Sequence, residues 1–435
     1  MSASAKKMGF WQCWGMSVGV MIGSGIFLLP AVLAPFGWIS LLGWLLTSVG
    51  TIVLALVLAR LAGTTDHAGG PYAYVKESFG DLAGFLIGWG YWVGVVFGVT
   101  AIAVAFAGYM GSIFPIFAAN SLAQAAIAAA GIGALTWINI RGVSQAATVQ
   151  LVLTILKIIP LIVIIGLGIS YGDMDNFPAF NPQELPITQA LASTALFTMW
   201  AFIGIEAAVI PTDEVENPKK IIPIAVVCAA LSVSCLYVGA SVAIMFLVPL
   251  DILALSESPF VDAAAHLGPG GALLVGVGAL ISTAGALNGN IFVMGQMPML
   301  VAADGLAPSV IAKKNTGGAP AIALMASSVF SAALLVLNFT DGLVGAFSFL
   351  ISMSTLSILA PYGLSALAEF KRSYRSAKGW AGVALLSLLY TLIAAAGSGW
   401  YVTLMGVGLF LFGILLFKVF HYQQLSMSVK ISETE

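Results

Sequence analysis

Two ionisable side chains lie inside apolar stretches of the sequence, where a charge is costly. Lys157 falls within residues 146–170 and Glu206 within residues 188–210. Such a group costs roughly 2.5–3.5 kcal/mol at the centre of a bilayer on insertion scales, so neither should face lipid. Groups of this kind usually mark ion or substrate pathways, although satisfaction by backbone carbonyls alone is the simpler alternative. We therefore predict that Lys157 and Glu206 take part in coupling.

Glycines interrupt two of the apolar stretches. Gly23-Ser24-Gly25 stands in the first, and Gly204 precedes Glu206 in the sixth. Interruptions at corresponding positions in two halves of a chain point to a transporter binding site. Free N–H groups at the start of a half-helix can hold a carboxylate, and free carbonyls can hold an ammonium group. Close helix packing is the other interpretation of these small residues, but the matching breaks favour a site for a small zwitterion.

The elements that must position these residues are apolar segments of membrane-spanning length. Hydrophobic residues make up 60% of the chain and charged residues 8%, whereas a soluble domain usually has about 25% charged residues. About 20 apolar residues cross a bilayer as a helix, and continuous apolar runs exclude a transmembrane barrel. We expect an all-α integral membrane protein with twelve transmembrane helices, at residues 9–34, 38–61, 82–115, 121–140, 146–170, 188–210, 222–248, 270–302, 320–338, 342–367, 381–398 and 400–420.

The distribution of basic residues predicts the orientation. Fifteen of the sixteen Lys and Arg residues fall in the tails, in alternate loops or at the ends of the spans that border them, and the charged residues of the opposite loops are all acids. Cytoplasmic loops are enriched in Lys and Arg. This asymmetry predicts a multi-pass protein of the cytoplasmic (inner) membrane with both termini in the cytoplasm.

Composition and the scarcity of polar groups exclude other classes of protein. A formal net charge of −2 without a basic stripe excludes a nucleic-acid binder. The odd number of cysteines, three, argues against a disulfide framework. An enzyme would need paired or clustered ionisable groups at membrane depth, and only Lys157 and Glu206 are there, so we expect no enzyme, cofactor or metal. A signalling receptor is not expected either, because the predicted tails are short.

Five motifs in order resemble those of the amino acid–polyamine–organocation transporters. They occupy residues 23–27, 68–74, 202–206, 213–220 and 302–308. The most similar branch is that of the basic amino acid and polyamine antiporters, such as arginine/agmatine exchangers. The resemblance implies a LeuT-like fold with broken first and sixth helices. Its expected divisions are a tail at residues 1–8, inverted repeats of five helices each at 9–170 and 188–367, two further helices at 381–420, and a tail at 421–435.

The resemblance also implies a central substrate site between the two broken helices. Backbone N–H groups of Ser24 and Gly25 would receive the substrate carboxylate. Carbonyl groups near Met21, Trp200 and Ile203 would receive its amino group. A small-molecule substrate, an amino acid or amine, is therefore the expected partner, together with the lipid bilayer and, as a further possibility, a second copy in a homodimer.

Gates follow from the same resemblance. Trp200 would be a middle gate over the substrate, although an apolar helix also accommodates a tryptophan for packing alone. An inner gate would be formed by Tyr91, Glu206 and Tyr362. The alternative for the two tyrosines is a place in the belt of aromatic residues at the membrane–water interface.

Some positions of the expected site depart from the arginine/agmatine pattern. Val20 and Val99 stand where those exchangers have asparagine, and Asn290 stands where an outer-gate tryptophan is expected. With Ile102 and Ser354, the wall of the site is apolar and lightly polar. No second carboxylate is present to receive a distal cationic group, which weakens the interpretation as a site for a cationic substrate.

Lys157 is a further departure, because related branches carry lysine there in place of a sodium ion. These are proton-coupled amino acid symporters and heteromeric-type neutral amino acid exchangers. In such a site Lys157 would contact carbonyls near Gly19 to Ile22 and a hydroxyl such as Ser282 or Thr283. The leading expectation is a secondary active transporter of amino acids or related amines, working by alternating access as an exchanger or with protons. The alternative is a proton-coupled symporter or exchanger of neutral amino acids that uses Lys157 in place of sodium.

Overall fold

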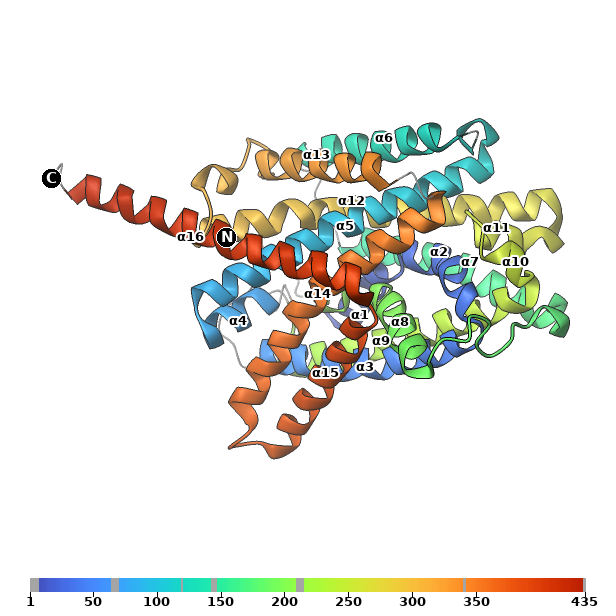
Figure 1. The fold of residues 1–435 in the computed structure, drawn as a ribbon, viewed down its shortest axis with the longest axis horizontal. Coiled ribbons are helices and arrows are strands. Elements are labelled where there is room, and N and C mark those ends of the chain that lie inside the picture. Colours follow the sequence, from blue (N-terminus) through green and yellow to red (C-terminus); the bar gives the residue numbers. More distant parts are fainter. Residues whose placement is uncertain are drawn as a thin grey trace.

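The computed structural model describes residues 8–63, 70–118, 120–141, 147–208, 215–338 and 342–432. Within these ranges the chain is all-helical, and the only β pairing is an isolated bridge between Met8 and Val215 (Figure 1). Residues 1–7 of the predicted tail, residues 68–69 of the second motif and residues 213–214 of the fourth lie outside the described ranges.

Helices occupy every range in which a membrane span is expected. The long elements are α1 (Phe10–Met21) with α2 (Ser24–Leu33), α3 (Ile39–Ala62), α5 (Asp81–Ile113), α6 (Ser121–Ile140), α7 (Ala147–Tyr171), α8 (Ile187–Trp200), α9 (Pro218–Leu247), α12 (Gly268–Ala303), α13 (Ala321–Asn338), α14 (Gly342–Ser373), α15 (Lys378–Ala396) and α16 (Gly399–Ser432). Short elements join them: η1 (Ala34–Phe36), α4 (Pro71–Phe79), η2 (Pro115–Ala118), η3 (Met174–Asn176), η4 (Ile205–Ala208), α10 (Leu250–Leu253), α11 (Pro259–Ala263), η6 (Ala264–Leu267) and η7 (Ser309–Ala312).

Fewer helices than the twelve expected spans meet the length and hydropathy that a membrane span needs, among the residues that the structure describes. Among the described residues, nine helices are long and apolar enough to cross a membrane, or ten if the bent pair α1–α2 is one span. The two remaining candidates are short, because α8 has only 14 residues before its break and the apolar part of α13 covers Ala321–Val336.

Burial separates a central helix from peripheral ones. In the most apolar stretch of α5, 89% of the residues are buried, against 17% in α16. Figure 1 shows α16 crossing the front of the bundle, with its C-terminal end projecting beyond the other helices. The apolar residues of α16 therefore face outward, as lipid contact requires, whereas α5 belongs to the core that holds the site.

Both predicted helix breaks are present. The first helix bends by 43° between α1 and α2, at Ile22 and Gly23. The sixth ends as an α-helix at Trp200 and continues through a turn to η4, with Gly204 at a φ of +103°. This backbone conformation strains any residue with a side chain. A Cβ atom on Gly204 would lie 2.2 Å from Cγ1 of Val20, so the two breaks are in direct contact.

Candidate functional site

A small cavity lies between the two breaks. Its volume is about 40 Å³, and its wall comes from α1, α2, α5, α12, α14 and the end of α8. A water molecule needs roughly 10–15 Å³ on this measure. The cavity therefore holds a few waters at most, and binding of an amino acid requires the surrounding helices to move apart.

Most of the predicted substrate-contacting residues meet at this cavity. Those on its wall are Met21, Gly25, Ile102, Trp200, Ile203, Asn290 and Ser354, with Val20, Gly23, Val95, Gly98, Ala201, Ala286 and Ile358. Val99 is fully buried but does not line the cavity. The polar side-chain groups on this wall are those of Asn290 and Ser354 and the indole N–H of Trp200.

The start of α2 borders the cavity. The first turn of a helix leaves its N–H groups without intrahelical partners, and α2 begins at Ser24. A Cβ atom on Gly25 would lie 3.1 Å from Cζ3 of Trp200 and 3.3 Å from Cα of Ala201. A side chain at this position would therefore press against Trp200 and Ala201, which would have to shift by a few tenths of an ångström.

Tyr237 on α9 joins the carbonyl groups of the two breaks, a role that sequence reasoning missed. Its hydroxyl donates to the carbonyl of Met21 at 2.7 Å and lies 3.4 Å from the carbonyl of Ala201. The carbonyl of Trp200, in turn, accepts from the N–H of Ile203 at 3.3 Å. Two of the carbonyls predicted to receive an amino group thus already accept a hydrogen bond.

Trp200 is held against α14 over the cavity. Its Nε1 donates to Oγ of Ser354 at 3.3 Å, and Ser354 donates to the carbonyl of Gly94 at 2.7 Å. The ring of Phe347 meets the indole edge-on, with 5.4 Å between the centroids. The indole is therefore held in place by one hydrogen bond and one ring contact. Breaking these two contacts would free it to move.

Trp200→Leu should impair transport more than it impairs folding. Stacking and cation–π contacts with an aromatic ring are worth about 0.5–2 kcal/mol, which corresponds to a rise of roughly 2-fold to 30-fold in apparent KM. Uptake into proteoliposomes, compared with the thermal unfolding of the same preparation, checks this. Trp400, which is 79% exposed, offers the matched control Trp400→Leu. Unchanged uptake by Trp200→Leu would leave the indole with a packing role only.

Glu206 forms the predicted cluster with the two tyrosines. Its Oε1 accepts from the hydroxyl of Tyr91 at 2.8 Å, and its Oε2 accepts from the hydroxyl of Tyr362 at 2.7 Å and from the N–H of Gly204 at 3.1 Å. The residue is 1% exposed. Three donors from α5, α14 and the break satisfy the buried carboxylate, so this cluster closes the bundle below the cavity.

Glu206→Gln should flatten the pH dependence of transport. Glutamine keeps the size of the side chain but loses its charge and one of two acceptor oxygens. If the carboxylate takes up a proton during the cycle, the variant remains in one charge state throughout. Initial exchange rates between about pH 5 and pH 8 test this, with the exposed Glu77→Gln as control. A wild-type pH profile in Glu206→Gln would indicate a purely structural glutamate.

A larger cavity lies on the far side of this cluster. It measures about 260 Å³, and we call it the vestibule; Tyr91 and Glu206 line it together with Pro71, Tyr72, Ile87, Phe292, Val293, Gln296, Met297 and Leu300. Tyr91 and Glu206 do not line the central cavity. The cluster of Glu206 with Tyr91 and Tyr362 is therefore the wall between the two spaces, as an inner gate requires.

Two sequence motifs meet beside the vestibule. Asp304 accepts a hydrogen bond from the hydroxyl of Tyr72 at 2.8 Å and pairs with Nζ of Lys76 at 2.6 Å. Burial raises the pKa of Asp304, but the hydrogen bonds from Lys76 and Tyr72 and the charge of Lys76 outweigh it, so the pKa lies below its ordinary value. The contact ties α4 to the end of α12.

The opposite side of the central cavity is closed by aromatic rings. Along α5, Tyr109 lies beyond the cavity in the direction away from Tyr91. Its hydroxyl donates to the carbonyl of Phe27 at 2.7 Å, and the rings of Phe27 and Phe260 are 4.8 Å apart. The structure therefore has a packed aromatic barrier on this side, whereas polar contacts close the vestibule side.

Lys157 makes the predicted contact with the first helix. Its Nζ donates to the carbonyl of Gly19 at 3.0 Å, and the residue is 5% exposed. The predicted hydroxyl contact with the eighth span is wrong. Oγ1 of Thr283 donates to the carbonyl of Leu280 at 2.9 Å within its own helix, and the buried Oγ of Ser282 has no hydrogen-bond partner among the described residues.

A glycine explains how the lysine side chain fits beside α12. A Cβ atom on Gly285 would lie 3.4 Å from Cε and 3.7 Å from Nζ of Lys157. The alkyl chain therefore passes over Gly285 to reach the first helix just before its break. Among the described residues, no group of three His, Cys, Asp or Glu side chains could hold a metal ion.

Comparison with known proteins agrees with this geometry. The family model of the amino acid permeases matches residues 8–429. The cadaverine/lysine antiporter of Escherichia coli is 32% identical over 77% of this chain and 76% of its own length. The putrescine transporter PotE of Haemophilus influenzae is 30% identical over 96% and 99%. The arginine/ornithine antiporter of Pseudomonas aeruginosa is 31% identical over 83% and 78%.

The match spans both broken helices, the central cavity and the cluster around Glu206. Together with the apolar helices it makes the protein a multi-pass membrane protein and a transporter, not an enzyme. The chain belongs to the amino acid permease family.

Proposed function

We propose that this protein exchanges a basic amino acid for a related amine or amino acid across the cytoplasmic membrane by alternating access. The observation that carries the proposal is the contact of two broken helices around a closed cavity, with the cluster of Glu206 and two tyrosines between this cavity and the vestibule. The relatives named above exchange or transport lysine, cadaverine, putrescine, arginine or ornithine. Glu206 is the carboxylate placed to attract the distal positive charge of such a substrate when the gate opens.

The breaks supply complementary partners for the two ends of an amino acid. The N–H groups at the start of α2, at Ser24 and Gly25, would receive the carboxylate. The carbonyls of the sixth helix near Ala201 and Ile203 would receive the amino group, in competition with Tyr237. Trp200 would lie over the bound substrate.

Helix packing supports the proposed inverted repeats within a twelve-span arrangement. Each of four elements in the first half packs against its counterpart in the second: α1 on η4, α3 on α9, α5 on α12, and α6 on α13. A two-fold axis in the membrane plane brings equivalent helices together in this way. The concentration of Lys and Arg in alternate loops supports the proposal that both termini lie on the cytoplasmic side of the inner membrane.

Coupling is assigned to Lys157 in this proposal. The ammonium group contacts Gly19 of α1, one turn before the break, at the depth where a cation would otherwise bind backbone carbonyls. A tethered charge fills such a site permanently, so the exchanger would need no sodium.

A thermal-shift screen of the purified protein tests the proposal. A ligand at 100 times its Kd stabilises the protein that binds it by about 2.7 kcal/mol. Lysine, ornithine, arginine, cadaverine and putrescine should raise the unfolding temperature, and neutral amino acids of equal size should not. A shift with neutral amino acids alone would reject a basic substrate, and loading proteoliposomes with the active compound then tests whether uptake requires exchange.

A further inference from the structure

One helix, α14, contacts the moving parts of the proposed transporter at three depths. Ser354 accepts from Trp200, Tyr362 donates to Glu206, and Glu369 pairs with Arg60 of α3. At about 100° per residue, the three α14 side chains point within roughly 80° of one another. The first two contacts belong to the cavity and its inner gate, whereas the third lies at the end of the helix.

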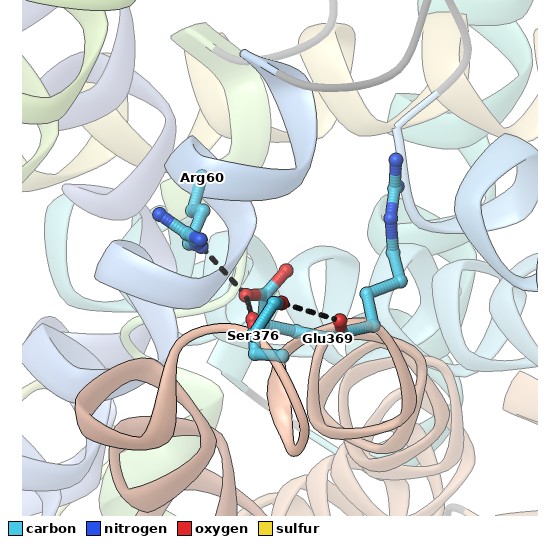
Figure 2. A network of polar contacts seen from close by, with 5 residues as sticks. Arg60, Glu369 and Ser376 are labelled. Carbon is cyan, nitrogen blue, oxygen red and sulfur yellow. Dashed lines mark hydrogen bonds and ion pairs between the residues drawn. The ribbon is translucent and has the colours of Figure 1, made fainter.

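Several contacts support the Arg60–Glu369 ion pair, although both residues lie near helix ends. Nε of Arg60 lies 2.6 Å from Oε1 of Glu369, whose side chain is 2% exposed. Ser373, one turn further along α14, donates to the same oxygen. The guanidinium group of Arg60 lies 4.5 Å from the ring centroid of Trp380 on α15. Figure 2 shows Arg60 reaching from α3 towards Glu369, with Ser376 in the turn that follows the end of α14.

The pair joins α3 to α14 near the ends of both helices. The helix α3 packs against α8 and α9, whereas α14 packs mainly against α5 and also contacts α8 and α3. A buried ion pair is weak evidence for stability, because well-packed apolar residues often serve as well. Its distinctive property is that removing one partner strands a buried charge. Such a contact suits a junction with two discrete states.

We infer that Arg60 and Glu369 are positioning residues that latch the bundle shut on the vestibule side. While the pair is intact, α3 stays against α14 and the inner gate of Glu206, Tyr91 and Tyr362 cannot separate. Opening towards the cytoplasm requires the pair to part, with Ser373 and water as the remaining partners of the carboxylate. This inference rests on the proposed alternating-access function.

Cysteine accessibility tests the latch without any substrate. Val95 lines the central cavity and is 3% exposed, so Val95→Cys reports whether a reagent passes the inner gate. The native cysteines Cys13, Cys228 and Cys235 are free and are first replaced by alanine. A charged, membrane-impermeant thiol reagent is then added from the cytoplasmic side of inside-out vesicles.

Glu369→Gln in this background should accelerate labelling about tenfold, within the roughly 5–150-fold range of coupling between distant sites. Labelling from the opposite side should not increase. Exchanging the charges, Arg60→Glu with Glu369→Arg, should restore slow labelling, and the exposed Glu77→Gln should change nothing. If Glu369→Gln does not insert, Arg60→Lys replaces it: lysine keeps the charge but loses the stack on Trp380, so labelling should be intermediate.

Labelling at the parental rate in the variant that inserts would overturn the latch and leave the pair with a structural role. This result is independent of whether a tested compound is transported. Failure of the thermal-shift screen would reject the proposed substrates, but an effect of Glu369→Gln on sidedness would still show that the pair controls access.

Discussion

Gly25→Val should abolish substrate binding while the protein still folds and inserts. A Cβ atom at this position would lie 3.1 Å and 3.2 Å from two ring atoms of Trp200 and 3.3 Å from Cα of Ala201. Valine adds two methyl groups beyond this atom, beside a cavity of only about 40 Å³. The side chain would therefore occupy the place of the carboxylate and hold the sixth helix away from the N–H groups of α2.

Titration of the purified variant with the compound found in the screen measures the effect, which we expect to exceed about 100-fold in Kd, or roughly 2.7 kcal/mol. Gly133→Val on α6 is the matched control, because a Cβ atom there meets nothing within 4 Å. Normal affinity in Gly25→Val would remove the start of α2 from the binding site.

Lys157→Ala should cripple exchange or make it dependent on an added cation. The ammonium group donates to the carbonyl of Gly19 at 3.0 Å, so its removal leaves this carbonyl without its charged partner next to the break. Wild-type uptake should be the same in sodium, potassium and choline salts, because the tethered charge already fills the cation position. We expect a loss of about tenfold or more in the alanine variant, since hydrogen bonds to charged groups contribute roughly 1.5–3 kcal/mol.

Radiolabelled uptake into proteoliposomes of defined salt composition measures both effects. Lys157→Met separates charge from volume, because methionine fills the path over Gly285 without an ammonium group. It should fail as the alanine variant does. A sodium requirement in the wild type, or full activity in Lys157→Ala, would leave Lys157 as a buried structural residue.

Several parts of the site could be predicted from the sequence because they depend on local properties of the chain. Hydropathy located helices at all expected spans, since each must be apolar along its own length. Gly204 lies in the interrupted part of the sixth span, and the structure gives it a φ of +103°, which residues with side chains rarely adopt. The cluster of Tyr91, Glu206 and Tyr362 and the contact between Lys157 and Gly19 join different helices, and they were expected from the resemblance to the transporter family and not from local properties.

What the tertiary structure alone decided are pairings between helices. Tyr237 resembles any core aromatic in an apolar run, yet its depth and rotation bring its hydroxyl to the carbonyl of Met21. In the sequence, Arg60 and Glu369 resemble ordinary charged residues at helix ends. Only the packing of α3 on α14 buries the carboxylate of Glu369 against Arg60. The position of Thr283 in the sequence is compatible with a contact to Lys157, but its hydroxyl donates within its own helix instead. Residue type and spacing fix what a side chain can bond to, whereas the rotation and depth of each packed helix determine which partner it meets.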